Sequence, residues 1–189
     1  MGARLLATLA LLTVMPAAAS AQAVSFADLQ GATVEASVTY RQDRRTASGE
    51  TSGEVRQNWR LVIGPGEAIQ YTSTITASGP RGSRSSAPNA GTARLGRPGQ
   101  ARSHGGGHGL WVFMGGTLTF LRTYQGEGGY KRSITFRRGA GGFTCSIRTA
   151  FARENGRGPV RFTSPISGSE VEILRAQPIS SSCRVLKAG

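Results

Sequence analysis

Alternation of apolar and polar residues is the dominant pattern of this chain. Between Thr33 and Arg41 every second residue is apolar or aromatic, which is the period of a strand with one buried face. In the next such stretch, residues 55–63, Gln57 interrupts the apolar face. The pattern predicts nine strands, at 33–41, 55–63, 68–76, 110–114, 117–123, 130–136, 143–152, 170–176 and 181–186. Glycine-rich segments separate most of them, so the chain is predicted to be all-β.

The order of these strands suggests how they pair. Residues 110–152 hold four strands joined by three short glycine turns, and consecutive strands with short turns favour antiparallel neighbours. We therefore expect an up-and-down meander of about eight to nine strands that closes into a small barrel, because closure removes exposed strand edges. A β-sandwich is the alternative architecture.

If the strands run up and down, their connections alternate between the two ends of the barrel. One end receives the short connections 64–66, 115–116, 139–141 and 176–178. The other end receives the longer connections 42–52, 79–107, 126–129 and 153–165. Small barrels often bind a ligand at the mouth that carries the long loops. We therefore expect a basic mouth above an aromatic interior.

Two sets of residues are the candidate binding site. The predicted ligand-binding residues of the interior are Trp59, Tyr71, Phe120, Phe143 and Phe151. The predicted anion-binding residues of the rim are Arg44, Arg45, Arg81, Arg84, Arg94, Arg97, Arg102, Arg153 and Arg157. The alternative is that the aromatic side chains simply pack a tight core without a cavity.

The segment 79–107 differs from its surroundings. It is rich in Gly, Ser, Arg, Pro and Ala, and Leu95 is its one large apolar residue. A segment with so little to bury is expected to be flexible. The predicted organisation is one β domain over residues 22–189 that carries this flexible insert.

The first 21 residues have the features of a signal peptide. Arg4 precedes an apolar run, Leu5 to Met15, and small residues lead to a cleavage site after Ala21, with Ala23 as the rival position. The run is shorter than the roughly 20 residues that a membrane-spanning helix needs. We therefore expect no transmembrane segment and a periplasmic or secreted protein.

The cysteine content agrees with export. Cys145 and Cys183 are the two cysteines of the chain, and an oxidising compartment lets such a pair form a disulfide. Two separate buried thiols are the alternative.

The charge is strongly basic and unevenly spread. The formal net charge is +13, and residues 79–107 contain five arginines and no acid. Such an excess favours anionic partners, here an anionic glycan, lipid or envelope surface, whereas export disfavours nucleic acid. A coding bias toward arginine is the alternative explanation, and the oligomeric state is not fixed by the sequence.

Catalytic and metal-binding motifs are weak. His104 and His108 have a zinc-like spacing, but three glycines between them disfavour the helix that such a pair needs. No Gly-x-Ser-x-Gly motif occurs, so we expect no metal, no cofactor and no catalytic residue.

The expected function is that of a non-enzymatic exported barrel that binds an apolar or amphiphilic small ligand or an anionic envelope surface. A hydrolase of unknown type and a purely structural envelope protein are the alternatives.

The opening Phe26-Ala27-Asp28-Leu29-Gln30-Gly31, followed by a strand, is loosely similar to the start of lipocalin-like barrels. Ala32 and Thr33 stand where those barrels carry a tryptophan, so no family is assigned from this resemblance.

Overall fold

The computed structural model of the protein describes residues 23–80, 82–96, 98–99, 108–124, 128–152 and 160–186. One short 3-10 turn, η1 (Ala27–Leu29), precedes the strands. The strands are β1 (Thr33–Thr46), β2 (Gly49–Ile63), β3 (Ala68–Gly79), β4 (Gly82–Ser85), β5 (Asn89–Arg94), β6 (Pro98–Gly99), β7 (His108–Met114), β8 (Thr117–Tyr124), β9 (Gly128–Gly139), β10 (Gly142–Ala152), β11 (Val160–Thr163) and β12 (Glu170–Leu186). The all-β prediction is confirmed. The predicted signal peptide lies outside the described residues.

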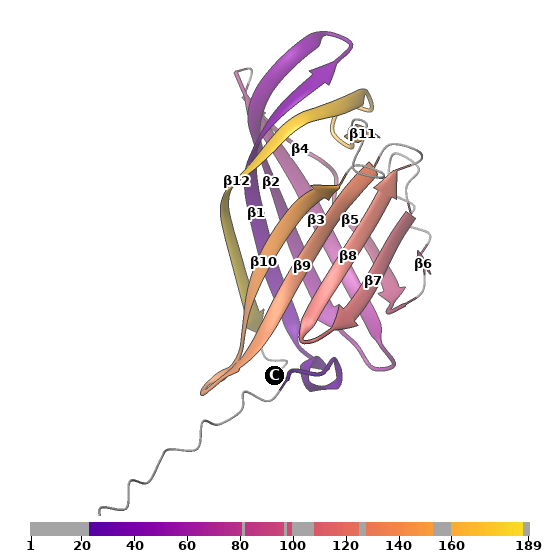
Figure 1. Ribbon diagram of the computed structural model, residues 1–189, viewed down its shortest axis with the longest axis vertical. Coiled ribbons are helices and arrows are strands. Elements are labelled where there is room, and N and C mark those ends of the chain that lie inside the picture. The colour runs from indigo at the N-terminus through magenta and orange to yellow at the C-terminus, as the bar shows by residue number, and fades with distance from the viewer. Residues whose placement is uncertain are drawn as a thin grey trace, which may run out of the picture.

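The strands form two antiparallel sheets that curve around a common core (Figure 1). The first sheet has the order β11-β12-β1-β2-β3-β4, and β5 also pairs with β3. The second sheet has the order β10-β9-β8-β7-β6. Successive strands are neighbours in most of this order, which confirms the predicted meander.

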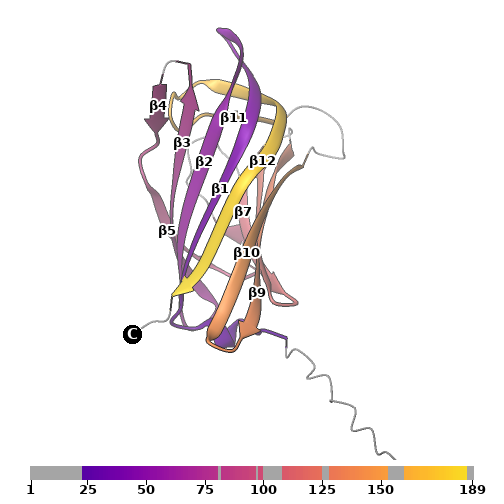
Figure 2. The same ribbon diagram turned by 90° about the vertical axis from the view of Figure 1, so that its left-hand side faces the viewer.

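The two sheets meet along both of their edges. Along one edge β10 lies beside the lower part of β12 (Figures 1 and 2), and the disulfide between Cys145 and Cys183 joins them, with the two Cα atoms 5.4 Å apart. The predicted pairing of the two cysteines is therefore confirmed. At the other edge the amide of Gly96 donates a hydrogen bond to the carbonyl of Trp111 on β7, at 2.8 Å. These contacts give the two sheets the form of a small barrel.

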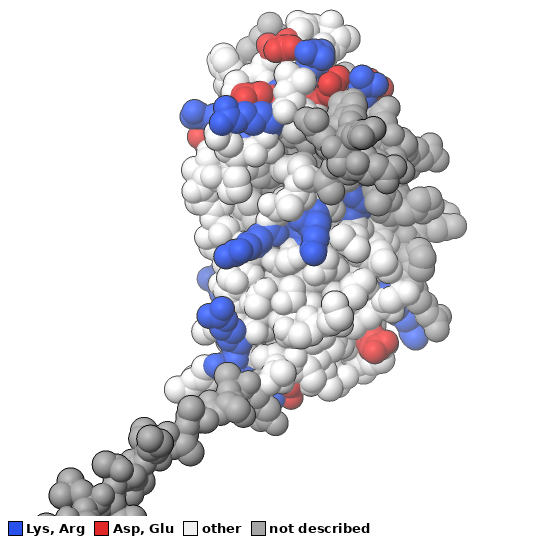
Figure 3. All heavy atoms as spheres, in the orientation of Figure 1, with Lys and Arg blue, Asp and Glu red and all other residues white. Residues whose placement is uncertain are grey.

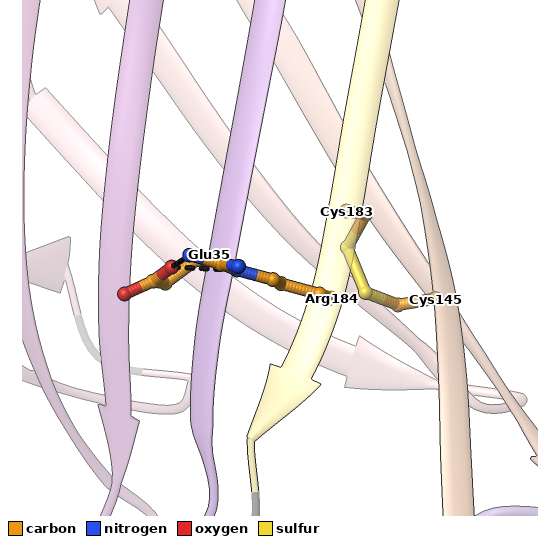
Figure 4. Close-up of a disulfide and its surroundings, with 4 residues drawn as sticks. All are labelled: Glu35, Cys145, Cys183 and Arg184. Carbon is orange, nitrogen blue, oxygen red and sulfur yellow. Dashed lines mark hydrogen bonds and ion pairs between the residues drawn. A yellow bond between two sulfur atoms is a disulfide. The ribbon is translucent and has the colours of Figure 1, made fainter.

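Cys183 and its neighbour Arg184 point to opposite faces of β12 (Figure 4). Cys183 reaches Cys145 on β10, whereas Arg184 extends across the outer face to Glu35 on β1 and donates to its carboxylate. Arg60 on β2 approaches the same carboxylate at 3.8 Å. This cross-strand row of charges links three strands on the solvent side.

The segment before β1 covers one end of the barrel, which we call the closed end. Val24, Phe26 and Leu29 are buried there, and the Phe26 ring lies 5.5 Å from the Phe113 ring. The amide of Gly31 donates to the carbonyl of Ile63, beside the β2–β3 turn. The opposite end, with the β1–β2 turn at 47–48, is called the far end.

The predicted loop at 42–52 is wrong. β1 and β2 continue through it as one long hairpin and turn only at 47–48. The reason is that the polar side chains of this stretch satisfy one another across the two strands. Arg45 donates to Glu50 at 2.7 Å, and Ser52 donates to Asp43 at 2.7 Å.

The predicted break at 176–178 is also wrong, because β12 runs through it. Pro178 pairs with Tyr40, and the next pair joins Thr39 to Ser180, so Ile179 is an extra residue on β12. A bulge of this kind accommodates a proline, which has no amide hydrogen for the ladder.

Parts of two further expected loops are strands. β4 and β5 lie within 79–107 and both pair with β3, β4 along Thr76–Gly79 and β5 along Ala68–Ser73. β11 lies within 153–165 and pairs with β12. Composition alone could not reveal this pairing, because it is supplied by the distant partner strands. The flexibility of residues 79–107 stays a prediction.

The disulfide should contribute much of the stability where β10 meets β12, since no ladder joins these two strands among the described residues. The bonded cysteines are 38 residues apart, and closing such a loop contributes about 4 kcal/mol on chain-entropy grounds. We predict that replacing both cysteines by serine lowers the free energy of unfolding in urea by that order.

The matched control replaces Ser146 and Ser182 by alanine. These residues are the exposed neighbours of the two cysteines, so the change should stay within about 0.5 kcal/mol. A cysteine-free protein as stable as the oxidised wild type would show that the edge is held by other contacts.

Candidate functional site

The buried polar side chains of this protein gather in one place. Five polar or charged side chains are buried among the described residues: Gln42, Gln57, Ser73, Arg122 and Arg132. All five line a single interior cavity of ≈270 Å³. Burying a polar group is costly unless it finds a partner, so this clustering marks the cavity as the candidate site.

Strand alternation explains how these side chains come to face inward. On β1 the buried positions run Val34, Ala36, Val38, Tyr40 and Gln42, starting at the closed end. On β9 they run from Phe136 through Ile134 to Arg132. On each strand the inward side chains therefore change from apolar near the closed end to polar toward the far end.

A cluster of aromatic rings forms the floor of the cavity. The Phe120 ring lies 4.7 Å from that of Trp111 and 5.4 Å from that of Trp59. The Tyr71 ring lies 6.1 Å from the Trp111 ring. Trp59, Tyr71 and Phe120 also line the cavity, so the floor offers an apolar, planar surface.

Gly91 on β5 makes room for one of these rings. A Cβ atom at this position would lie 2.8 Å from the Tyr71 hydroxyl oxygen and 3.0 Å from its ring. Glycine thus allows the β5 backbone to approach Tyr71 closely. This contact positions the Tyr71 ring at the cavity floor.

The guanidinium of Arg132 lies over two aromatic rings at the cavity. Its guanidinium carbon lies 4.1 Å from the Tyr130 ring centre and 5.2 Å from that of Trp59. Its Nε atom donates to the Thr149 hydroxyl at 3.3 Å. The side chain is 4% exposed, so the cavity contains a buried positive charge in a fixed position.

Tyr40 adds a protonated hydroxyl to the cavity wall. Burial raises the pKa of this phenol above its ordinary value of 10.0, and the nearby positive charge of Arg132 opposes that rise in part. The Tyr40 ring also lies 5.4 Å from the Phe151 ring. At neutral pH the hydroxyl is therefore protonated and can donate a hydrogen bond.

The predicted interior residues separate into two groups. Trp59, Tyr71, Phe120 and Phe151 lie around the cavity. Phe143 does not line it: it lies beside the β9–β10 turn near the closed end, where the Arg138 guanidinium covers its ring at 5.3 Å.

The predicted basic rim is brought together only in part. Arg44 and Arg45 lie near the far end, where Arg45 pairs with Glu50 and Glu172, and Arg84 is exposed on β4. Basic and acidic side chains are interspersed at this end (Figure 3). The rim residues Arg81, Arg97, Arg102, Arg153 and Arg157 lie outside the described residues.

The placement of Arg94 on that rim is wrong. Arg94 pairs with Ala68 beside the β2–β3 turn, near the closed end. The reason is that β4 and β5 follow β3 along most of its length, so residues 82–94 run from the far end toward the closed end.

Sequence reasoning missed the charged residues of the cavity, Arg122 and Arg132. A signal for Arg132 was present, because it occupies an inward position in the alternating series that includes Ile134 and Phe136. Gln57 was noticed only as an interruption of an apolar face. An isolated polar residue on the inward face of a strand is the pattern that would have found the site.

Metal chemistry finds no support at this site. Within the described ranges, no three His, Cys, Asp or Glu side chains are close enough together to hold a metal ion. The two histidine side chains, His104 and His108, are not among those that the structure describes.

Comparison with models of protein families, with curated proteins and with solved structures finds no match for this chain. The function therefore has to be argued from the cavity itself.

The aromatic floor should also stabilise the fold. We predict that Phe120→Ala lowers the free energy of unfolding by about 3–5 kcal/mol, because it removes a buried ring that contacts Trp59, Trp111 and Tyr130. Phe143→Ala removes the same side chain from the periphery and should cost less than about 2 kcal/mol. Equal decreases in the free energy of unfolding for Phe120→Ala and Phe143→Ala, measured in urea, would contradict this difference between core and periphery.

The buried phenol predicts a dependence of stability on alkaline pH. Because the pKa of Tyr40 is raised in the folded state, its stabilising contribution is complete below about pH 10 and is lost as the pH rises through the raised value. Tyr40→Phe has no proton to lose, so its stability should fall less over this range. Parallel curves of unfolding free energy against pH for the wild type and Tyr40→Phe would show that the Tyr40 phenol does not cause the alkaline loss of stability.

Proposed function

We propose that the protein is an exported, non-enzymatic binding protein that holds an apolar or amphiphilic small ligand in its interior cavity. One observation carries the proposal: all the buried polar side chains of the described residues line the same cavity, above an aromatic floor. Ligand sites of proteins are typically apolar concavities with a few polar groups that orient the ligand.

The chemistry of the lining supports binding over catalysis. The described residues around the cavity include no aspartate, glutamate, histidine, cysteine or lysine. The serines of the lining, Ser73 and Ser86, therefore lack a general base among those residues, and a serine nucleophile needs one. This favours a binding protein over the hydrolase alternative.

The rim gives weaker support to binding of an anionic envelope surface. Arg45 and Arg161 both pair with Glu172, and Arg45 also pairs with Glu50. Such pairs reduce the positive charge that the described part of the rim can offer to a polyanion. The interior cavity is therefore the better candidate site.

Two observations support export. The disulfide is typical of proteins from oxidising compartments, and the first residues have the features of a signal peptide. Among the described residues, no helix is long and apolar enough to cross a membrane.

The proposal is tested with N-phenylnaphthylamine, a neutral probe that becomes fluorescent in apolar sites. We predict saturable binding to the oxidised wild type. Ser73→Phe places a large ring at a buried position of the cavity wall and should weaken binding at least about tenfold, since overpacking of 1–3 kcal/mol has this effect.

The matched control is Thr72→Phe, which adds the same ring to the exposed face of β3, one residue away. It should leave the affinity within about twofold. An affinity that Ser73→Phe leaves unchanged, or a wild type that does not bind the probe, would refute the proposed site.

A further inference from the structure

We infer that the ligand is an anion, and that its charged group binds Arg132 while its apolar part lies on the aromatic floor. This inference rests on the proposed function and specifies the ligand class for the same cavity. The chemistry is that of a carboxylate, phosphate or sulfate attached to a small apolar body.

The first argument is the buried charge itself. An arginine side chain stays protonated at any pH that a protein tolerates, and Arg132 is 4% exposed. Removing such a cation from water costs several kcal/mol. The rings of Tyr130 and Trp59 recover part of this cost, and an anion would recover more.

The second argument is an excess of hydrogen-bond donors. Arg132 Nη1 and Trp59 Nε1 are both buried, and neither has a hydrogen-bond partner among the described residues. Both residues line the cavity. Buried donors normally find acceptors, so the wall of this cavity contains two donors that lack an acceptor among the described residues.

The third argument is the sign of the charge around the cavity. The described lining contains two arginines, Arg122 and Arg132, and no acidic residue. The protonated Tyr40 hydroxyl, whose pKa burial raises, adds a donor on the same wall. A cationic ligand would meet repulsion, and a neutral one would leave the charge of Arg132 uncompensated.

The geometry of Arg132 suits an anion in a further way. The guanidinium carbon lies over the rings of Tyr130 and Trp59, and the Thr149 hydroxyl accepts a hydrogen bond from Nε. Of its nitrogens, Nη1 is buried and has no hydrogen-bond partner among the described residues. A guanidinium edge is the part that binds carboxylate and phosphate oxygens.

The test uses probes that share one alkyl chain and differ in the head group. Decanoate, decyl phosphate, decanol and decylammonium compete with N-phenylnaphthylamine for the oxidised wild type. We expect decanoate or decyl phosphate to bind at least about tenfold more tightly than decanol, since a charge-assisted hydrogen bond contributes about 1.5–3 kcal/mol. Decylammonium should bind most weakly. The stronger of the two anions identifies the preferred head group.

The matched variants are Arg132→Gln and Lys131→Gln, which remove the same charge from adjacent positions of β9. Lys131 is exposed, whereas Arg132 is buried. Arg132→Gln should remove the preference for the anion over decanol. Lys131→Gln should preserve the preference.

The outcomes separate this inference from the proposed function. If N-phenylnaphthylamine and all four alkyl probes fail to bind, both proposals fail. If decanol binds as tightly as the anions to the wild type, the cavity binds ligands but the anionic class is wrong. The wild-type comparison decides the question even if Arg132→Gln does not fold.

Discussion

Each strand of this barrel places every second side chain in the interior, and that constraint governs both the fold and the site. Near the closed end these positions hold Val34 and Leu61, which pack as a core. Toward the far end the same alternation delivers Gln42, Gln57 and Arg132. The cavity lies where these polar side chains converge, and a buried polar side chain is costly unless it finds a hydrogen-bond partner.

Core and cavity share the aromatic floor, while other contacts that stabilise the fold lie away from the cavity. The segment before β1 covers the closed end, the disulfide joins β10 to β12, and the bond between Gly96 and Trp111 joins the other edge. These contacts join the two sheets at the closed end and along their edges. The interior toward the far end can therefore contain a buried charge and unpaired donors, which would be costly in a tightly packed core.

Much of the fold was predictable because its signal is local. Period-two alternation and glycine turns predicted most strands of the meander, and two cysteines in a chain with features of an exported protein predicted the disulfide. The hairpin around residues 42–52 and the bulge at Pro178 were not predictable in this way, since they depend on the partner strand. Composition likewise concealed β4 and β5, whose pairing is supplied by β3.

The site was predictable only in part, for a related reason. Aromatic residues at inward positions identified Trp59 and Phe120, but Arg132 was not among the predicted site residues. An arginine is normally expected on the solvent-exposed surface. Only the alternation of Arg132 with Ile134 indicates that its side chain faces inward. Arg94 was misplaced because its position depends on how far β5 follows β3.

The most direct test of this account is a crystal structure of the oxidised protein grown with decanoate. The account predicts electron density for the alkyl chain over Trp59 and Phe120, with a carboxylate oxygen within hydrogen-bonding distance of Arg132. A structure in which the interior is packed without a cavity, and Arg132 turns outward to solvent, would contradict it.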